Sequence, residues 1–73
     1  MKIKLQDKDY HINKTDGESD KIFLKRIEFL KKVFDDTSDI NYSISLSKIW
    51  LYYTFKKCKY SPEVFYKIKK YLL

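Results

Sequence analysis

The 73-residue chain contains no alanine and only one glycine, one proline, one cysteine and one histidine. A single glycine excludes a glycine-rich phosphate-binding loop, and the lone Cys58 excludes an intrachain disulfide. No pair of Cys or His has the spacing of metal ligands, and His11 has no second histidine to work with. We therefore expect no enzymatic activity, no catalytic residue, no metal site and no cofactor.

Long apolar runs are also missing. No stretch approaches the ~20 residues that span a bilayer, and residues 1–10 alternate charged and hydrophobic side chains, unlike a signal peptide. A secreted chain of this size usually carries several cysteines. The sequence therefore predicts a protein of the nucleus or the cytoplasm, a reducing compartment, with no membrane partner.

What the chain does have is lysine and aromatic residues. Its net charge is +6, 44% of the residues are hydrophobic and 18% are aromatic, which fits one domain over residues 1–73. A chain this small buries only about 60–65% of its unfolded surface, so a partner is plausible on stability grounds. Nearly all the basic residues are lysines, with Arg26 the one exception, whereas nucleic-acid contacts favour arginine. The positive charge therefore favours nucleic-acid binding less than it would in an arginine-rich chain, and a protein partner is the preferred interpretation.

The N-terminal residues have the period-two pattern of a β-hairpin. With the turn at residues 7–8, Leu5 would pair with Tyr10 and Ile3 with Ile12. All four apolar side chains would then share one face, while the intervening His11 would face solvent.

Helical spacing follows. A helix is predicted from about residue 20 to the polar residues 35–38, with one buried stripe made of Phe23, Ile27, Leu30 and Phe34. Residues 40–45 alternate again and predict a short third strand. From about residue 46 the spacing is helical once more. A last helix is predicted from Ser61, with Pro62 at its first position and an expected buried face of Val64, Phe65, Ile68, Tyr71 and Leu72.

Five aromatic residues gather near the end of the third quarter of the chain: Trp50, Tyr52, Tyr53, Phe55 and Tyr60. One helix face cannot bury all of them. Neighbouring exposed Tyr and Phe side chains are typical of protein-contact surfaces. The alternative is that the hairpin covers them.

Residues 46–56, Leu-Ser-Lys-Ile-Trp-Leu-Tyr-Tyr-Thr-Phe-Lys, resemble a helix of the Elongin C family. These are BTB/POZ-fold adaptors of cullin-RING ubiquitin ligases that also belong to a transcription elongation factor. Shorter similarities occur in the family's order at residues 4–5, 30–34, 39–42 and 61–64. The resemblance implies an α+β, BTB/POZ-like fold: an N-terminal β-hairpin and a short third strand packed with three or more α-helices.

The resemblance also implies a function. A member of this family bridges a cullin scaffold, a ubiquitin-like Elongin B partner and a helix of a substrate receptor. By position, Tyr52 matches a tyrosine at the cullin and receptor surface, and four residues match the receptor-helix pocket: Pro62, Phe65, Tyr66 and Ile68. Together with Phe55 and Tyr60, these are the expected protein-binding residues.

Several features differ from the family. Tyr60 runs directly into Ser61 where the family has a loop, and Lys69 and Lys70 stand at apolar positions. Two alternatives stay open. One is a viral or parasite protein that uses the fold to capture a host factor. The other is a small basic nucleic-acid-binding module built on Lys56, Lys57 and Lys59 with Tyr52 and Tyr60.

Overall fold

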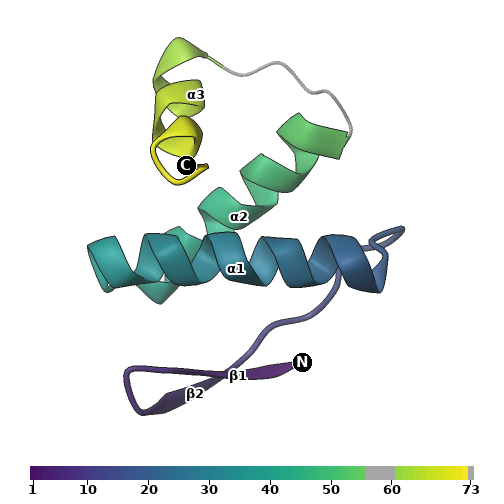
Figure 1. Ribbon diagram of the computed structural model, residues 1–73, viewed down its shortest axis with the longest axis vertical. Coiled ribbons are helices and arrows are strands. Elements are labelled where there is room, and N and C mark those ends of the chain that lie inside the picture. The colour runs from purple at the N-terminus through teal and green to yellow at the C-terminus, as the bar shows by residue number, and fades with distance from the viewer. Residues whose placement is uncertain (56–60, 73) are drawn as a thin grey trace.

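The computed structural model describes residues 1–55 and 61–72 of the chain. Helix α1 crosses the middle of the molecule, with the hairpin on one side and helix α3 on the other (Figure 1). The predicted α+β arrangement is confirmed in its coarse form, as an antiparallel hairpin and three helices. The elements are β1 (Lys2–Leu5), β2 (Lys8–His11), α1 (Asp20–Thr37), α2 (Ile40–Phe55) and α3 (Pro62–Lys69).

The hairpin turns one residue earlier than predicted. Leu5 pairs with Lys8, not with Tyr10, and the two turn residues are Gln6 (φ 48°) and Asp7 (φ 65°). Positive φ at both central positions gives a two-residue turn whose twist matches that of the strands. The predicted register is therefore wrong by two positions, because the turn, and not the apolar pattern, sets the pairing.

The predicted apolar face of the hairpin is nevertheless confirmed. Ile3 lies opposite Tyr10, and Ile12 exchanges a backbone hydrogen bond with Met1 (N to O, 2.8 Å). Side chains alternate with period two, so a displacement of two positions leaves each residue on its original face. Ile3, Leu5 and Ile12 are buried and Tyr10 is half-buried.

The predicted helix α1 has a capping residue at each end. The Ser19 hydroxyl accepts a hydrogen bond from the Ile22 N–H (3.2 Å), as an N-cap serine does. At the other end Ser38 adopts a left-handed conformation (φ 55°), and its N–H donates to the Phe34 carbonyl (2.8 Å). Both ends agree with the sequence prediction.

Helix α1 buries two faces, of which the sequence predicted one. The predicted stripe packs under the hairpin in a first cluster made of Ile3, Leu5, Ile12, Phe23, Ile27, Leu30 and Phe34. A second cluster joins α1 to the other helices and consists of Phe29, Val33, Leu46, Trp50, Leu51 and Ile68. Because α1 lies between two layers, a single amphipathic stripe cannot describe it.

The predicted third strand at residues 40–45 is wrong, because these residues begin helix α2. Asp39 caps this helix, since its Oδ1 accepts from the Tyr42 N–H (3.1 Å). The buried face also contains two serines and recurs at helical spacing: Ser43, Leu46, Ser47, Trp50 and Leu51. Serine carries no hydrophobic signal, so the apolar residues alone show only the alternation of Ile40, Tyr42 and Ile44. That alternation is the pattern of a strand, which explains the wrong prediction.

Helix α3 begins as predicted. The Ser61 hydroxyl accepts from the Val64 N–H (3.4 Å), and Pro62 occupies the first helical position. Its predicted buried face is only partly buried. Ile68 is fully buried, whereas Leu72 is exposed and three residues are half-buried: Val64, Phe65 and Tyr71. The outer side of α3 is therefore open to a partner.

Candidate protein-contact surface

Three aromatic rings from α2 and α3 form a continuous set that ends in solvent. The centroid of the Tyr53 ring lies 5.3 Å from that of Phe65, and Phe65 lies 6.3 Å from Tyr66. Tyr53 and Phe65 are half-buried, while Tyr66 is 68% exposed. We name these residues the α2–α3 aromatic surface. Tyrosine offers a large apolar area with a polar tip, and for that reason it is frequent at interfaces.

Two of the predicted protein-binding residues, the consecutive Phe65 and Tyr66, belong to this surface. Pro62 is exposed at the start of α3 and Tyr52 is half-buried on α2, whereas Ile68 is fully buried in the second cluster. Ile68 therefore faces the core and not solvent. The side chain of Phe55 and the whole of Tyr60 lie outside the described residues.

Tyr53 was not among the predicted contact residues. Tyr53 lies at helical spacing from Leu46 and Trp50, which is typical of a core position, and the structure leaves its side chain half-buried. Its ring contact with Phe65 depends on how α3 packs against α2. No local sequence signal specifies that packing.

The C-terminal end of α3 is tied to the end of α1 by one carboxylate. Asp36 Oδ2 accepts hydrogen bonds from Tyr71 Oη (2.5 Å) and Lys70 Nζ (3.0 Å). The hydrogen bond from Tyr71, followed by the hydrogen bond and charge of Lys70, holds the pKa of Asp36 below its usual value. The same hydrogen bond to Asp36 raises the pKa of Tyr71. These contacts orient α3, and with it Phe65 and Tyr66.

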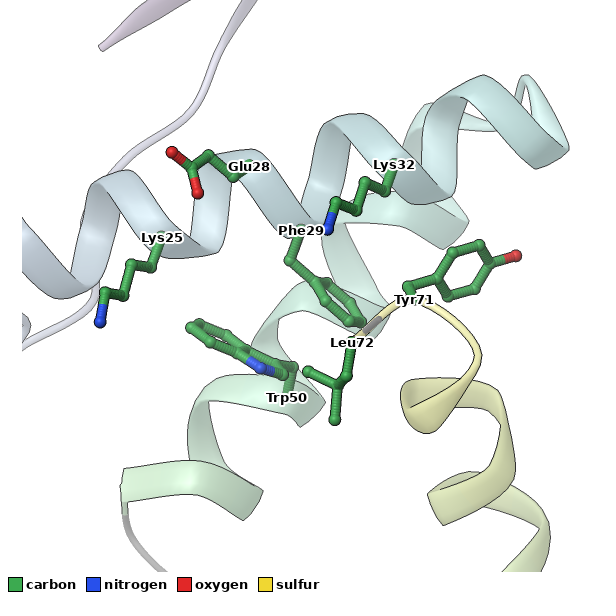
Figure 2. Close-up of a pocket in the computed structure, with 7 residues that line it drawn as sticks. All are labelled: Lys25, Glu28, Phe29, Lys32, Trp50, Tyr71 and Leu72. Atoms are coloured by element: carbon green, nitrogen blue, oxygen red, sulfur yellow. The ribbon is translucent and has the colours of Figure 1, made fainter.

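A pocket of about 200 Å³ lies beside this anchor (Figure 2). Phe29 of α1 stacks on Trp50 of α2 (5.6 Å between centroids, 17° between planes), and Tyr71 meets Phe29 edge-on at 6.0 Å. Leu72 lies near these rings, and three charged residues of α1 complete the lining: Lys25, Glu28 and Lys32. Typical small-molecule sites measure roughly 300–1,000 Å³, so this pocket suits one side chain of a partner better than a cofactor.

The sequence did not predict this pocket. Its walls come from α1 (residues 25–32), from α2 (residue 50) and from the residues 71–72 that follow α3, and only the packed structure brings these together. Lys25 and Lys32 are exposed, and they also border an apolar floor.

The remaining candidate residues from the sequence, His11, Cys58 and the lysines near residue 58, add no second site among the described residues. His11 is exposed on the outer face of the hairpin. Within residues 1–55 and 61–72 there is no group of three or more His, Cys, Asp or Glu that could hold a metal ion, and no helix is long and apolar enough to cross a bilayer. Cys58 lies outside the described residues, as do the lysines of the nucleic-acid alternative: Lys56, Lys57 and Lys59.

In comparisons with known proteins, no protein-family model, curated protein or solved structure matches the chain. The resemblance to Elongin C therefore rests on the sequence segments quoted above. The α2–α3 aromatic surface is supported separately, by the ring distances and exposures of Tyr53, Phe65 and Tyr66.

Proposed function

We propose that the chain is a non-catalytic protein–protein adaptor that binds its partner through the α2–α3 aromatic surface. The observation that supports this most is the position of Tyr66. The residue is 68% exposed and its ring lies beside that of Phe65, which in turn lies beside that of Tyr53. Tyrosines backed by other rings are typical interface hot spots.

The surface is also held in place before any partner arrives. Ser61 caps α3 at one end, and Asp36 binds Lys70 and Tyr71 at the other. An ordered helix loses less conformational entropy on binding than a flexible segment does. This favours recognition of a folded or helical partner by the surface as it stands.

At the level of family, we propose a compact BTB/POZ-like adaptor that resembles Elongin C. The resembling segment begins at residue 46 and lies largely on α2, and the hairpin precedes the helices as the family order requires. The proposed partners are a cullin N-terminal domain, an Elongin B-like protein and a receptor helix, in a ubiquitin ligase or an elongin-type complex. Of the residues matched to the receptor-helix pocket, Pro62 and Tyr66 are exposed, Phe65 is half-buried and Ile68 is buried.

Size-exclusion chromatography of the purified chain with each of these three partners tests the proposal. We expect co-elution with at least one, with a Kd of about 1 μM or tighter. Tyr66→Ala should weaken this complex roughly thirtyfold and so reduce its co-elution. Leu24→Ala is the matched control, because Leu24 is also a large exposed side chain (51%) but lies on α1.

Two results would contradict the proposal. The first is the absence of a complex with all three partners. The second is binding to a DNA or RNA duplex that weakens steeply as salt is added, which would favour the nucleic-acid alternative.

A further inference from the structure

The pocket beside Trp50 lies outside the proposed contact surface. None of its lining residues belongs to the α2–α3 aromatic surface or to the positions matched to the receptor-helix pocket. Its floor is the stacked pair of Phe29 and Trp50, and Tyr71 and Leu72 form a wall beside them (Figure 2). Leu72 is 47% exposed, so an apolar side chain stands in solvent at the edge of an aromatic floor.

The volume of this pocket suits one bulky apolar side chain. It measures about 200 Å³, and an apolar cavity of roughly 150 Å³ is enough to hold a benzene ring. A phenylalanine, leucine or methionine side chain of a partner would therefore fit. It would also cover the apolar surface that Leu72 leaves exposed.

Two lysines flank the floor of the pocket. Lys25 and Lys32 lie seven residues apart on α1, which separates them by about 10 Å along the helix axis. Figure 2 shows their ammonium groups at opposite ends of the pocket. Their spacing from Glu28 would allow ion pairs along the helix, yet neither lysine forms an ion pair with any described residue. Two ammonium groups against one carboxylate give the lining a net positive charge.

Another cavity of similar size does not combine these features. It measures about 190 Å³ and lies where the end of the hairpin, α1 and α2 meet. Arg26 and His11 are among its lining residues, and we name it the Arg26 cavity. Its lining includes no Phe, Tyr or Trp, so it has no floor of stacked rings.

We infer that the pocket beside Trp50 binds an acidic segment of a protein partner. One bulky apolar side chain of that segment lies over the rings of Phe29 and Trp50, and carboxylates on either side of it pair with Lys25 and Lys32. An extended segment rises roughly 3.3 Å per residue, so acidic residues within two positions of the apolar one span the distance between the lysines. The net charge of the whole chain, +6, also attracts an acidic partner.

The single tryptophan of the chain reports on this pocket, because it lies in the floor. The full chain is titrated, at constant ionic strength, with the end-capped peptide Asp-Glu-Phe-Glu-Asp while the fluorescence of Trp50 is recorded. The emission should change and saturate with a Kd of about 1 mM or tighter, as expected for one side chain and two exposed charge pairs. The same peptide with serine in place of phenylalanine, and the peptide Lys-Lys-Phe-Lys-Lys, should give no saturable change.

Two double variants show whether the charge effect is local. Lys25→Gln/Lys32→Gln should weaken binding of the phenylalanine peptide by about tenfold, because one exposed ion pair contributes up to about fivefold. Lys21→Gln/Lys31→Gln is the matched control, since it removes the same charge from exposed positions of α1 that do not line the pocket. It should change the affinity by no more than about twofold. All four lysines are exposed, so the fold should persist in both proteins.

Equal losses in the two double variants would overturn the inference, because the net charge of the chain would then account for the binding. A serine peptide or a lysine peptide that binds as tightly as the acidic phenylalanine peptide would also overturn it, as would a signal that never saturates. Tyr66→Ala should leave this binding unchanged, since Tyr66 does not line the pocket. The result is therefore independent of the adaptor proposal.

Discussion

At the scale of single residues, Arg26 has a role that none of the described lysines has. It joins the linker at Asn13 and Glu18 to the middle of α1, and its guanidinium carbon lies 5.3 Å from the centroid of the Phe23 ring. Gly17, with φ at 82°, lies in the turn closed by the Glu18 N–H and the Thr15 carbonyl (3.1 Å). This turn positions Glu18 so that its carboxylate pairs with Arg26.

Removal of this carboxylate should be costly. Glu18→Ala leaves a buried guanidinium without its counter-charge, a loss of about 3–5 kcal/mol in the free energy of unfolding. Lys14→Ala removes the ion pair between Lys14 and Asp20, whose side chains are 45% and 84% exposed, and should cost at most about 1 kcal/mol. Urea unfolding followed by circular dichroism measures both. Equal losses in the two variants would mean that the buried pair does not stabilise the fold.

Trp50 and Tyr66 are both aromatic, but the structure gives them different roles. Trp50 is 7% exposed in the second cluster and Tyr66 is 68% exposed. Trp50→Ala should cost about 3–5 kcal/mol, and Tyr66→Ala should change stability by no more than about 0.5 kcal/mol. Thermal unfolding by circular dichroism compares them. A large loss of stability in Tyr66→Ala would show that its ring belongs to the core and not to a contact surface.

At the scale of the elements, α2 depends on small buried residues. Ser43 and Ser47 are 0% exposed. The Ser43 hydroxyl donates to the carbonyl of the capping residue Asp39 (2.7 Å), and the Ser47 hydroxyl donates to the Ile44 carbonyl within α2 (2.7 Å). With their hydroxyls satisfied internally, these residues occupy little space on the buried face. This allows α2 to lie close to α1.

A matched pair of serine variants tests this packing. Ser47→Leu forces a large side chain into the buried face of α2 and should lower the free energy of unfolding by about 1–3 kcal/mol. Ser45→Leu makes the same change at an exposed position of the same helix, where the effect should stay within about 0.5 kcal/mol. Chemical denaturation of both proteins gives the difference. If Ser47→Leu were neutral, the interface would have room that the structure does not show.

The anchor of α3 should respond to acid. The pKa of Asp36 is held below its usual value of 3.8, so its contribution to stability is present at neutral pH and is lost as the pH falls below that value. Asp36→Asn should therefore be less stable than the native chain at pH 7 and equal to it near pH 2. Thermal unfolding between pH 2 and pH 7 measures this. A difference that stays constant over this range would show that the charge of Asp36 does not matter.

How far the sequence predicts these elements depends on how local the signals are. The caps at Ser19 and Ser61 act within one helical turn, and the buried stripe of α1 follows one periodicity, so both were predictable. The start of α2 was not, because Ser43 and Ser47 are buried by contact with other elements and carry no hydrophobic signal of their own. The hairpin shows both cases, since its faces follow from the apolar pattern while its register follows from the turn.

The candidate sites divide in the same way. Phe65 and Tyr66 could be proposed from the sequence only through the resemblance to Elongin C, which matches both residues to the receptor-helix pocket. The pocket beside Trp50 and the cavity beside Arg26 could not, because each combines residues from three separate elements. Only the packed structure shows that the single arginine and the single histidine line one cavity.

At the scale of the whole molecule, α1 lies between two clusters of buried side chains and contributes residues to both. The hairpin covers one face, and α2 and α3 cover the other (Figure 1). In so small a chain neither cluster is large, which leaves stability marginal and makes added burial by a partner valuable. The α2–α3 aromatic surface and the Arg26 cavity share no residue.

The adaptor proposal is tested most directly by calorimetric titration of the purified chain with a peptide of an Elongin C-binding receptor helix. The native chain and Leu24→Ala should bind with the same affinity, and Tyr66→Ala should bind more weakly by about 2 kcal/mol, or roughly thirtyfold. No heat of binding with the native chain, or equal affinities for all three proteins, would contradict the proposal that this aromatic surface receives the receptor helix.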